Sequence, residues 1–393
     1  MQVGLVGAPN SGKSTFMKAC TLADVEIQNY PFTTIEANRG VGYVTTDCAC
    51  QDMDVTCDPN SKCVDGKRFV PVKMLDVAGL VPDAHEGRGL GNQFLDDLRE
   101  ADVLIHVLDI SGQTDAEGEP TDGYDPYQNV EFLERELEFW FEKIFEREWD
   151  RLSSEVKMEG REFEDLLLSR FSGLKIERED IRNVLNKRGL DPKDPGDWEK
   201  SDIQDFTSAL REQTKPMILA ANKIDKEGSD DNYRQLKEKT SRDVVPCCAE
   251  AELALREASK NGIVDYLPGS DSFEITDEEG ISEEQRKALD FVERILESYG
   301  STGVQKCMNK AVLDLLDMMV VYPVEDKNKL TDSKGNVLPD AVLLERGSTA
   351  EDLAYEIHSD IGEEFIGAID CKTDRKIGAD HELEHGDIIK ILN

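Results

Sequence analysis

The sequence lacks any uninterrupted apolar run close to the roughly 20 residues that a membrane-spanning helix requires. A signal-peptide pattern is also missing, because an apolar, strand-like segment begins at the second residue. Internal repeats and low-complexity tracts are absent too. From these absences we expect a cytoplasmic protein with no membrane partner.

Basic residues are scarce: 46 Lys and Arg stand against 83 Asp and Glu, which gives a formal net charge of −37. The acidic residues are dispersed and no basic stripe is visible, so the composition argues against nucleic-acid binding and we expect no DNA partner. An acidic, solvated surface is the simplest interpretation. Because concentrated salt screens charge repulsion to within a few ångströms, so much dispersed acid also suggests a halophilic source.

The nine cysteines are an odd number, and disulfides are rare in cytoplasmic proteins. Four of them fall within sixteen residues, namely Cys48, Cys50, Cys57 and Cys63. Four thiolates could hold Zn²⁺ tetrahedrally, but the spacing is not the paired C-x₂-C form of many zinc sites. Free reduced thiols in a loop are therefore the favoured interpretation, and a zinc site is the alternative.

A length of 393 residues and a hydrophobic content of 39% are sufficient for two or three domains with proper cores. Short apolar segments alternate with helical patterns, which predicts an α/β fold with a mainly parallel sheet and helices on both faces. The predicted strands are residues 2–6, 70–79, 102–110, 215–225 and 242–249.

A long interruption, residues 113–210, separates the third and fourth predicted strands. It opens with a turn-rich loop and continues as a helical pattern over residues 129–152. Six apolar side chains share one face of this helix: Leu133, Leu137, Trp140, Phe141, Ile144 and Phe145. An inserted helical domain with its own core is the favoured interpretation, and a helix pair that binds a partner protein is the alternative.

The C-terminal part changes from helices to short β segments. Helices are predicted over residues 285–298 and 304–318, and one more over 348–361. Four β segments accompany the last helix, at residues 319–325, 337–346, 363–373 and 387–393. This pattern predicts a small mixed β domain of about 75 residues.

A phosphate-binding loop follows the first predicted strand. Residues 7–14, GAPNSGKS, match G-x-x-x-x-G-K-[ST] at every fixed position and lie between a strand and a helix. Backbone N–H groups of such a loop surround the α- and β-phosphates, Lys13 adds charge at the β- and γ-phosphates, and the Ser14 hydroxyl faces Mg²⁺. The residues predicted to bind the phosphates are Gly7, Ala8, Pro9, Asn10, Ser11, Gly12, Lys13, Ser14 and Thr15.

Two motifs after later strands extend the predicted site. Asp76, in DVAG, is expected to hold Mg²⁺ through water while Gly79 approaches the γ-phosphate. Asp225, in NKID, can accept hydrogen bonds from N1–H and the 2-amino group of guanine, a donor pair that adenine lacks. The motif therefore predicts GTP and GDP as ligands. The other residues predicted at the base are Asn222, Lys223, and the pair Cys248 and Ala249, where a backbone N–H could meet guanine O6.

The residues predicted to take part in catalysis are Lys13, Thr34, Gly79 and Asn10. Mg²⁺ needs one more hydroxyl ligand when the γ-phosphate is present, and Thr34 is favoured over Thr33 for this role. The residue after Gly79 is Leu80, which cannot orient the attacking water as Gln does in many GTPases. Intrinsic turnover is therefore expected to be slow.

Asn10 could bind a cation that assists hydrolysis in a site without a water-orienting Gln. In several GTPases with a hydrophobic residue at the position of Leu80, an Asn at this place in the loop coordinates K⁺, which lies where the charge of an arginine finger would lie. The alternative is that Asn10 is a tolerant turn residue. His85 and Arg88 could contact the γ-phosphate or water, although surface-loop positions are the favoured interpretation for both.

With these motifs the chain resembles the Obg-related translation-factor class of GTPases, and within it the YchF-like GTPases. The resemblance rests on GAPNSGKST, NYPFTT, LDVAGLVPDAHEGRGLGNQFLDDLREAD, NKID and GSTGVQ, followed by KLTDSKGNVLPDAVLLERGSTAEDLAYEIH and HGDIIKIL. It covers nearly the whole chain. It implies a GTPase domain (G domain) with a helical insertion, a C-terminal TGS domain of ubiquitin-like β-grasp fold, and a slow GTPase or regulatory switch associated with ribosomes.

The resemblance and the pattern together predict four segments: 1–112 and 211–317 form the G domain with its linker helices, 113–210 the helical insertion, and 318–393 the TGS domain. One motif departs from the bacterial and eukaryotic YchF pattern, which typically carries a Glu-ended motif and tends to prefer ATP. Asp225 points to GTP instead. A nucleotide-dependent scaffold with incidental hydrolysis and an ATP-preferring enzyme stay open as alternatives. We expect a monomer.

Overall fold

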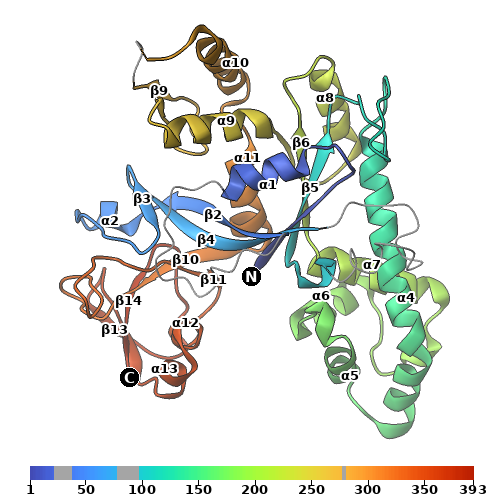
Figure 1. Ribbon diagram of the computed structural model, residues 1–393. Coiled ribbons are helices and arrows are strands. Elements are labelled where there is room, and N and C mark those ends of the chain that lie inside the picture. Colours follow the sequence, from blue (N-terminus) through green and yellow to red (C-terminus); the bar gives the residue numbers. More distant parts are fainter. Residues whose placement is uncertain (22–37, 78–96, 277–279) are drawn as a thin grey trace. The chain divides into compact units, whose positions relative to one another are not determined.

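The computed structural model describes residues 1–21, 38–77, 97–276 and 280–393 (Figure 1). The chain forms two compact units, each built from two separate stretches of sequence. The first unit combines Met1–Met17 with Met74–Ala249, and the second combines Lys18–Lys73 with Glu250–Asn393.

The core of the first unit is a sheet with the strand order β4-β1-β5-β6-β7. β1 pairs with β5, β5 with β6 and β6 with β7, all in parallel. Every residue of β5 and β6 is buried, because a parallel sheet is covered on both faces, and this explains their almost wholly apolar sequences. The strands are β1 (Gln2–Val6), β4 (Lys67–Asp76, with Met74–Asp76 in this unit), β5 (Val103–Asp109), β6 (Met217–Asn222) and β7 (Val244–Pro246). All five predicted strands are present, but the one predicted over residues 242–249 covers only Val244–Pro246, because the residues after it turn into a helix that begins at Ala249. Residues 78 and 79 lie outside the described part.

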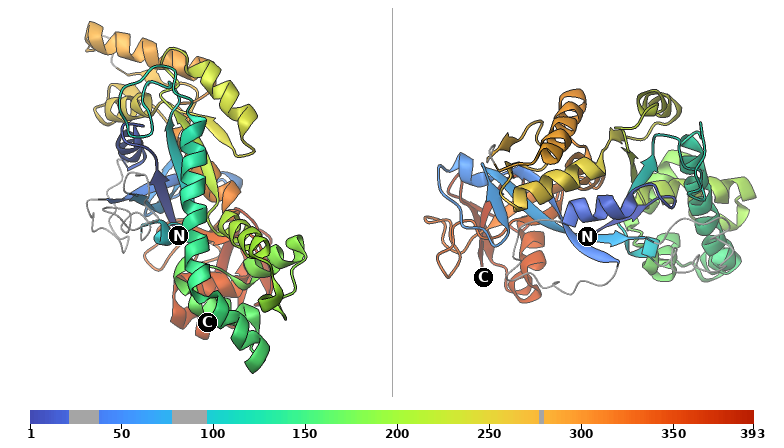
Figure 2. Two further views of the ribbon diagram at one scale, coloured as in Figure 1. Left: turned by 90° about the vertical axis from the view of Figure 1, so that its right-hand side faces the viewer. Right: turned by 45° about the horizontal axis from the view of Figure 1, so that its top comes forward.

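The helical region of the first unit follows β5 and is drawn in green in Figures 1 and 2. The ring of Phe145 forms its centre, with centroids 4.2 Å from Phe171, 6.2 Å from Phe206 and 6.4 Å from Phe141. Of the six residues predicted to share a helix face, five are buried and Ile144 is half-buried, which confirms the amphipathic pattern. The elements are α4 (Tyr127–Glu159), α5 (Phe163–Arg170), η2 (Ser172–Leu174), α6 (Arg178–Arg188), η3 (Pro195–Asp197) and α7 (Lys200–Thr214).

Along the chain, three more helices follow the strands that carry the sequence motifs. α1 (Lys13–Thr21) follows the phosphate loop, and α8 (Ser229–Lys239) follows β6 after a turn. α9 (Ala249–Lys260) begins directly after the turn that ends β7. Each of these turns therefore lies at the carboxyl end of a parallel strand, where open α/β sheets bind ligands.

The second unit opens with β structure that the sequence analysis did not predict. β3 (Lys62–Val64) pairs antiparallel with β4, and β2 (Arg39–Asp47) lies next to β4 on the sheet. A short helix, α2 (Ala49–Asp52), connects β2 to the loop before β3. β2 contains two glycines and only three buried residues, and β3 contains none that is fully buried, so neither carries a clear apolar pattern.

Helices and a small hairpin link this β region to the C-terminal sheet along the chain. The predicted helix 285–298 is α10 (Glu283–Tyr299), which begins with a reciprocal cap between Ser282 and Gln285. The predicted helix 304–318 is α11 (Val304–Asn309) followed by a π-helical turn, η4 (Lys310–Leu315). The hairpin strands are β8 (Val264–Asp265) and β9 (Glu274–Ile275).

The C-terminal sheet has the strand order β11-β10-β14-β12-β13. Its core contains Val321, Leu353, Ala368 and Ile389, from three strands and one helix. The predicted single helix is divided at His358, whose extended backbone (φ −167°) separates α12 from α13. The edge strand β13 was not predicted, because it is short and exposed. The elements are β10 (Met318–Pro323), β11 (Val342–Glu345), α12 (Ala350–Ile357), α13 (Ser359–Glu363), β12 (Gly367–Asp370), β13 (Arg375–Ile377) and β14 (Ile388–Leu392).

In the described ranges, no helix combines the length and the apolar character that a membrane crossing demands.

Candidate nucleotide-binding site

The phosphate loop joins β1 to α1 and contains two glycines that the fold requires. At Gly12 φ is +95°, and a Cβ atom there would lie 2.2 Å from the side-chain nitrogen of Asn222. At Gly7 a Cβ atom would lie 2.5 Å from the carbonyl oxygen of Val107. A side chain at either position would therefore clash with β6 or β5. The close approach sets the N-terminus of α1 beside the ends of these strands, a geometry suited to phosphate.

Lys13 and Asp76 meet at this end of the sheet. The Lys13 Nζ lies 3.4 Å from Asp76 Oδ1 and donates a hydrogen bond to the Val77 carbonyl at 2.8 Å. Asp76 Oδ1 is buried and accepts no hydrogen bond from the residues that the structure describes. Ser14 is exposed in the first turn of α1. A carboxylate oxygen that accepts no hydrogen bond and a hydroxyl are ligand types that Mg²⁺ prefers.

The Asn222 side chain joins the phosphate loop to the turn that begins α9. Its Nδ2 donates to the Ser11 carbonyl at 2.9 Å, and its Oδ1 accepts from the Ala249 N–H at 3.0 Å. Asn222 is only 2% exposed, so this buried amide has both ends paired, as burial of polar groups requires. The Ala249 N–H therefore donates to Asn222 in this structure. A hydrogen bond from a backbone N–H of this turn to guanine O6 stays a prediction.

Asp109 is a site residue that the sequence analysis missed. Lys223 Nζ lies 2.8 Å from Asp109 Oδ2 and donates to the Asn10 carbonyl at 2.7 Å. Burial alone would raise the pKa of Asp109, but hydrogen bonds from Lys223, Ser111 and Thr114 lower it below its usual range. Asp109 is therefore a buried anion that holds Lys223 over the phosphate loop. A signal was present, because Asp109 ends an apolar strand as Asp76 does.

Asp225 follows Lys223 at the end of the same turn, and its side chain is 7% exposed. Its Oδ1 accepts a hydrogen bond from the Cys248 thiol at 3.2 Å, and Lys226 lies 3.3 Å from its Oδ2. Cys248 and Asp225 thus come together from turns that are more than twenty residues apart in the sequence. The predicted base-binding residues lie at one place in the first unit.

Asn10 has φ +61°, a left-handed conformation that Asn adopts more readily than most residues with a side chain. Its Nδ2 donates to the Gly118 carbonyl at 3.0 Å. A Cβ atom on Gly118 would lie 2.8 Å from both the Cβ and the carbonyl oxygen of Pro9, so the loop after β5 touches the phosphate loop closely. The sequence analysis had not connected these two loops.

Several predicted site residues lie outside the described residues. They are Thr33, Thr34, Gly79, Leu80, His85 and Arg88. Their predicted roles stay predictions.

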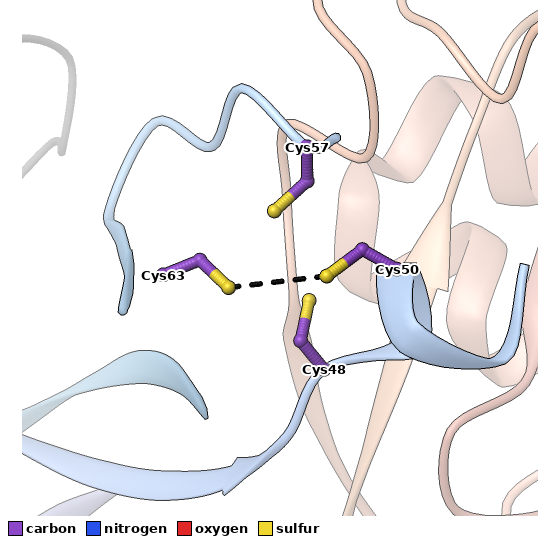
Figure 3. Close-up of side chains that lie close together, drawn as sticks. All are labelled: Cys48, Cys50, Cys57 and Cys63. Carbon is purple, nitrogen blue, oxygen red and sulfur yellow. Dashed lines mark hydrogen bonds between the residues drawn. The ribbon is translucent and has the colours of Figure 1, made fainter. Parts of the chain in front are cut away.

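The four clustered cysteines belong to the second unit, and the structure brings them together (Figure 3). Their Sγ atoms all lie within 4.8 Å of one another. None of the four is in a disulfide.

The fold and the contacts of the first unit define a P-loop guanine-nucleotide-binding protein. Residues 2–140 match the family described as 50S ribosome-binding GTPase, residues 220–326 match the G4 motif-containing domain of Obg-like GTPases of the YGR210-like type, and residues 334–393 match the TGS domain. The chain belongs to the Obg-like, YchF-like GTPases with a C-terminal TGS domain. The predicted family and fold class are confirmed.

Three relatives support this assignment. The chain is 50% identical over 394 residues to an uncharacterized GTP-binding protein of Methanocaldococcus jannaschii, covering 100% of this chain and 98% of the relative. The crystal structure of a GTP binding protein from Pyrococcus horikoshii OT3 is 38% identical with a TM-score of 0.80, over 100% of both chains. A ribosome-binding ATPase YchF of Haemophilus influenzae is 32% identical over 273 residues, which are 67% of this chain and 69% of that protein.

The pairing of Lys223 with Asp109 gives a first prediction. In Asp109→Asn the side chain keeps its shape but loses its charge, so Lys223 is held less firmly over the phosphate loop. We expect the affinity for GDP to fall about three- to tenfold, the equivalent of about one hydrogen bond. Calorimetric titration measures this. The control is Asp122→Asn, at an exposed position of the loop after β5, which should leave the affinity unchanged. Equal affinities in both variants would contradict the role of Asp109.

Proposed function

We propose that this protein hydrolyses GTP slowly to GDP and phosphate, and that it acts in the cytoplasm, as a monomer, as a nucleotide-dependent switch associated with ribosomes. The observation that carries the proposal is the position of Asp225, whose buried carboxylate lies in the turn that Asn222 and Lys223 fasten to the phosphate loop. A carboxylate fixed in this turn can select a base that presents two adjacent hydrogen-bond donors. Guanine has this pair and adenine does not.

The residues around Lys13 fit the phosphates and Mg²⁺. Lys13 supplies positive charge where the β- and γ-phosphates bind, and the N-terminus of α1 adds backbone N–H groups. Ser14 and Asp76 are the residues that would hold Mg²⁺, Ser14 directly and Asp76 through water. When bound, Mg²⁺ neutralises charge that develops on the phosphate oxygens. Thr34 and Gly79 complete the proposed set from the sequence.

Slow turnover follows from Leu80, the residue after Gly79. A leucine side chain has no group that can hydrogen-bond to water, so it cannot orient the nucleophile for attack on the γ-phosphate. Hydrolysis then depends on charge supplied from elsewhere. This requirement favours a switch that a partner or a cation activates over an enzyme with high intrinsic turnover.

The proposed domain boundaries separate the nucleotide-binding part of the chain from the helical insertion and the C-terminal domain. We place the G domain at residues 1–112 and 211–317, the helical insertion at 113–210, and the TGS domain at 318–393. The helices α4–α7, over Tyr127–Thr214, and the sheet β10–β14, over Met318–Leu392, support this division. The acidic composition, with a formal net charge of −37, supports a high-salt source.

The nucleotide preference tests the function directly. Asp225→Ala removes the acceptor for guanine N1–H and the 2-amino group, so we expect GTP affinity to fall about 10- to 100-fold and ATP affinity to change less than about threefold. Competition between fluorescent GTP and unlabelled GTP or ATP measures both. The control is Glu227→Ala, at an exposed acidic residue of the same turn. If ATP displaces the label from the unaltered protein as well as GTP does, selection of GTP by Asp225 is wrong, and if ATP displaces it better, the alternative of an ATP-preferring enzyme holds.

We also propose that Asn10 helps to bind K⁺ beside the phosphates. The contact of Asn10 with the next loop supports this: its Nδ2 donates to the Gly118 carbonyl at 3.0 Å, which fixes the side chain at the phosphate loop through its nitrogen and not through Oδ1, the oxygen that a cation would need. A monovalent cation at this place would supply the positive charge that an arginine finger supplies in other GTPases.

Turnover in KCl and NaCl at equal ionic strength tests the K⁺ proposal. We expect turnover to be at least about tenfold higher in KCl, the equivalent of about 1.4 kcal/mol in the barrier. Asn10→Ala should abolish this difference, whereas Asn10→Asp, which retains an oxygen ligand, should keep most of it. The proposal is wrong if the two salts give equal turnover, or if Asn10→Ala responds to K⁺ as the unaltered protein does.

Association with ribosomes is proposed because relatives of this chain are named ribosome-binding ATPases. Sedimentation with ribosomal particles tests it. We expect several-fold more protein with the particles in a non-hydrolysable GTP analogue than in GDP, because a switch presents a different surface in each state. The control is Asp225→Ala at the same nucleotide concentration, because we expect this variant to bind less of the GTP analogue. Absence from all ribosomal fractions in both nucleotides would favour the scaffold alternative.

A further inference from the structure

The four cysteines of the second unit converge on one point. Their Sγ atoms lie within 4.8 Å of one another, and those of Cys50 and Cys63 are 4.0 Å apart. In Figure 3 the four sulfur atoms point inward from different parts of the chain. Four sulfurs at about 2.3 Å from a single tetrahedral ion lie about 3.8 Å from one another. The observed separations are therefore close to those of a mononuclear site.

Two other uses of the four thiols fit the geometry less well. A disulfide needs two sulfurs at about 2.05 Å, and it would leave the remaining pair without a role. An iron–sulfur cluster places different thiolates on different irons, which separates the sulfurs more than a single ion does. Four sulfurs that are all mutual neighbours favour one ion, and four cysteines in a tetrahedral arrangement are a common structural site for zinc.

The chain around the cysteines has little else to fix its conformation. Cys48 is the N-cap residue of α2, a helix of four residues, and Cys50 is the second residue of that helix, whereas Cys63 lies on the three-residue strand β3. Between them, residues 53–61 form no helix or strand and carry Cys57. So short a segment buries little apolar surface, and in such cases a structural metal takes the place of a core.

A buried cation lies beside the cluster. Arg68 is fully buried, its guanidinium donates to the carbonyls of Leu338 and Pro339, and it lies over the ring of Tyr322 at 5.4 Å. Arg68 is also the residue opposite Cys63 in the antiparallel pairing of β3 and β4. A Zn²⁺ with four thiolates has a net charge of 2−, which is unfavourable next to buried groups unless a cation is near. Arg68 supplies that cation.

From this geometry we propose that Cys48, Cys50, Cys57 and Cys63 bind one Zn²⁺ as a structural site with four thiolate ligands. The spacing in the sequence favours free thiols, but spacing does not show that the loop folds back to bring Cys57 and Cys63 to the other two. The site is closed, since protein sulfurs fill all four positions of a tetrahedral ion. Its role is to stabilise the fold of this segment and not to activate water for catalysis.

The loop that carries Cys57, residues 53–61, is hydrogen-bonded to a segment near the start of the C-terminal sheet. The backbone N–H groups of Asp58 and Asn60 donate to the carbonyls of Val337 and Pro339 at 2.8 and 2.9 Å. The Asn60 side chain donates to Asp340 at 2.9 Å. All these residues belong to the second unit. The metal therefore fixes the loop at residues 53–61, which in turn binds residues 337–340, the segment before β11. Loss of the metal should make both segments less ordered.

Metal analysis of the full-length protein tests the proposal. We expect about one zinc per chain after purification under reducing conditions without chelator, or after dialysis against zinc followed by desalting. X-ray absorption at the zinc edge should show four sulfur ligands at about 2.3 Å. Less than about 0.2 zinc per chain after dialysis, iron in place of zinc, or nitrogen and oxygen ligands would each overturn the proposal.

Two variants and a matched control locate the site. Cys57→Ser and Cys63→Ser should lower the zinc content at least about fivefold, because serine is a poor zinc ligand. Cys371→Ser, at a half-buried cysteine of the same unit outside the cluster, should keep its zinc. GDP binding by each variant shows that the first unit is folded. If a variant fails to fold, zinc content and absorption spectra of the unaltered protein decide the question alone.

Hydrogen exchange separates a structural ion from an adventitious one. Removing zinc with a chelator should speed the exchange of the Asp58 and Asn60 amides at least about tenfold, since both N–H groups lose fixed acceptors. Exchange in β10 serves as the internal control. Equal exchange with and without zinc would show that the ion does not hold this loop.

Discussion

The nucleotide site depends on one buried amide, the side chain of Asn222. Its hydrogen bonds to Ser11 and Ala249 connect two loops that are 211 and 27 residues away from it in the sequence. These contacts are possible because β1, β6 and β7 run parallel and end at the same edge of the sheet. The phosphate loop and the base-binding turn are therefore fixed relative to each other before a nucleotide binds.

Charge is a second constraint. A chain with a formal net charge of −37 must hold a polyanionic nucleotide against its own field. Lys13 and Lys223 supply local positive charge, and each lies beside a carboxylate, Asp76 or Asp109, that keeps it in place. The N-terminus of α1 adds its dipole. Binding of an anion thus depends on a few fixed groups and not on the overall composition.

The second unit relies on polar and sulfur contacts where its segments are too short to form a core. Arg68 binds two carbonyls and lies over an aromatic ring, and the four thiols converge beside it. Sequence patterns did not predict β2, β3 or β13, because these strands are short, partly exposed or rich in glycine. The long buried strands β5 and β6 and the helix α4 were predicted, because each carries a strong apolar pattern.

The sequence by itself determined the phosphate loop, the acidic strand end and the NKID motif, because these depend on residue types at fixed spacing between local elements. The family followed from the resemblance of these motifs to known GTPases, and the positions of the main strands along the chain followed from their apolar patterns. Only the tertiary structure decided that Asp109 pairs with Lys223, that Asn10 meets Gly118, and that four cysteines share one point. These contacts join residues whose separation along the chain does not fix their distance in space. That distance is set by how the strands and loops pack.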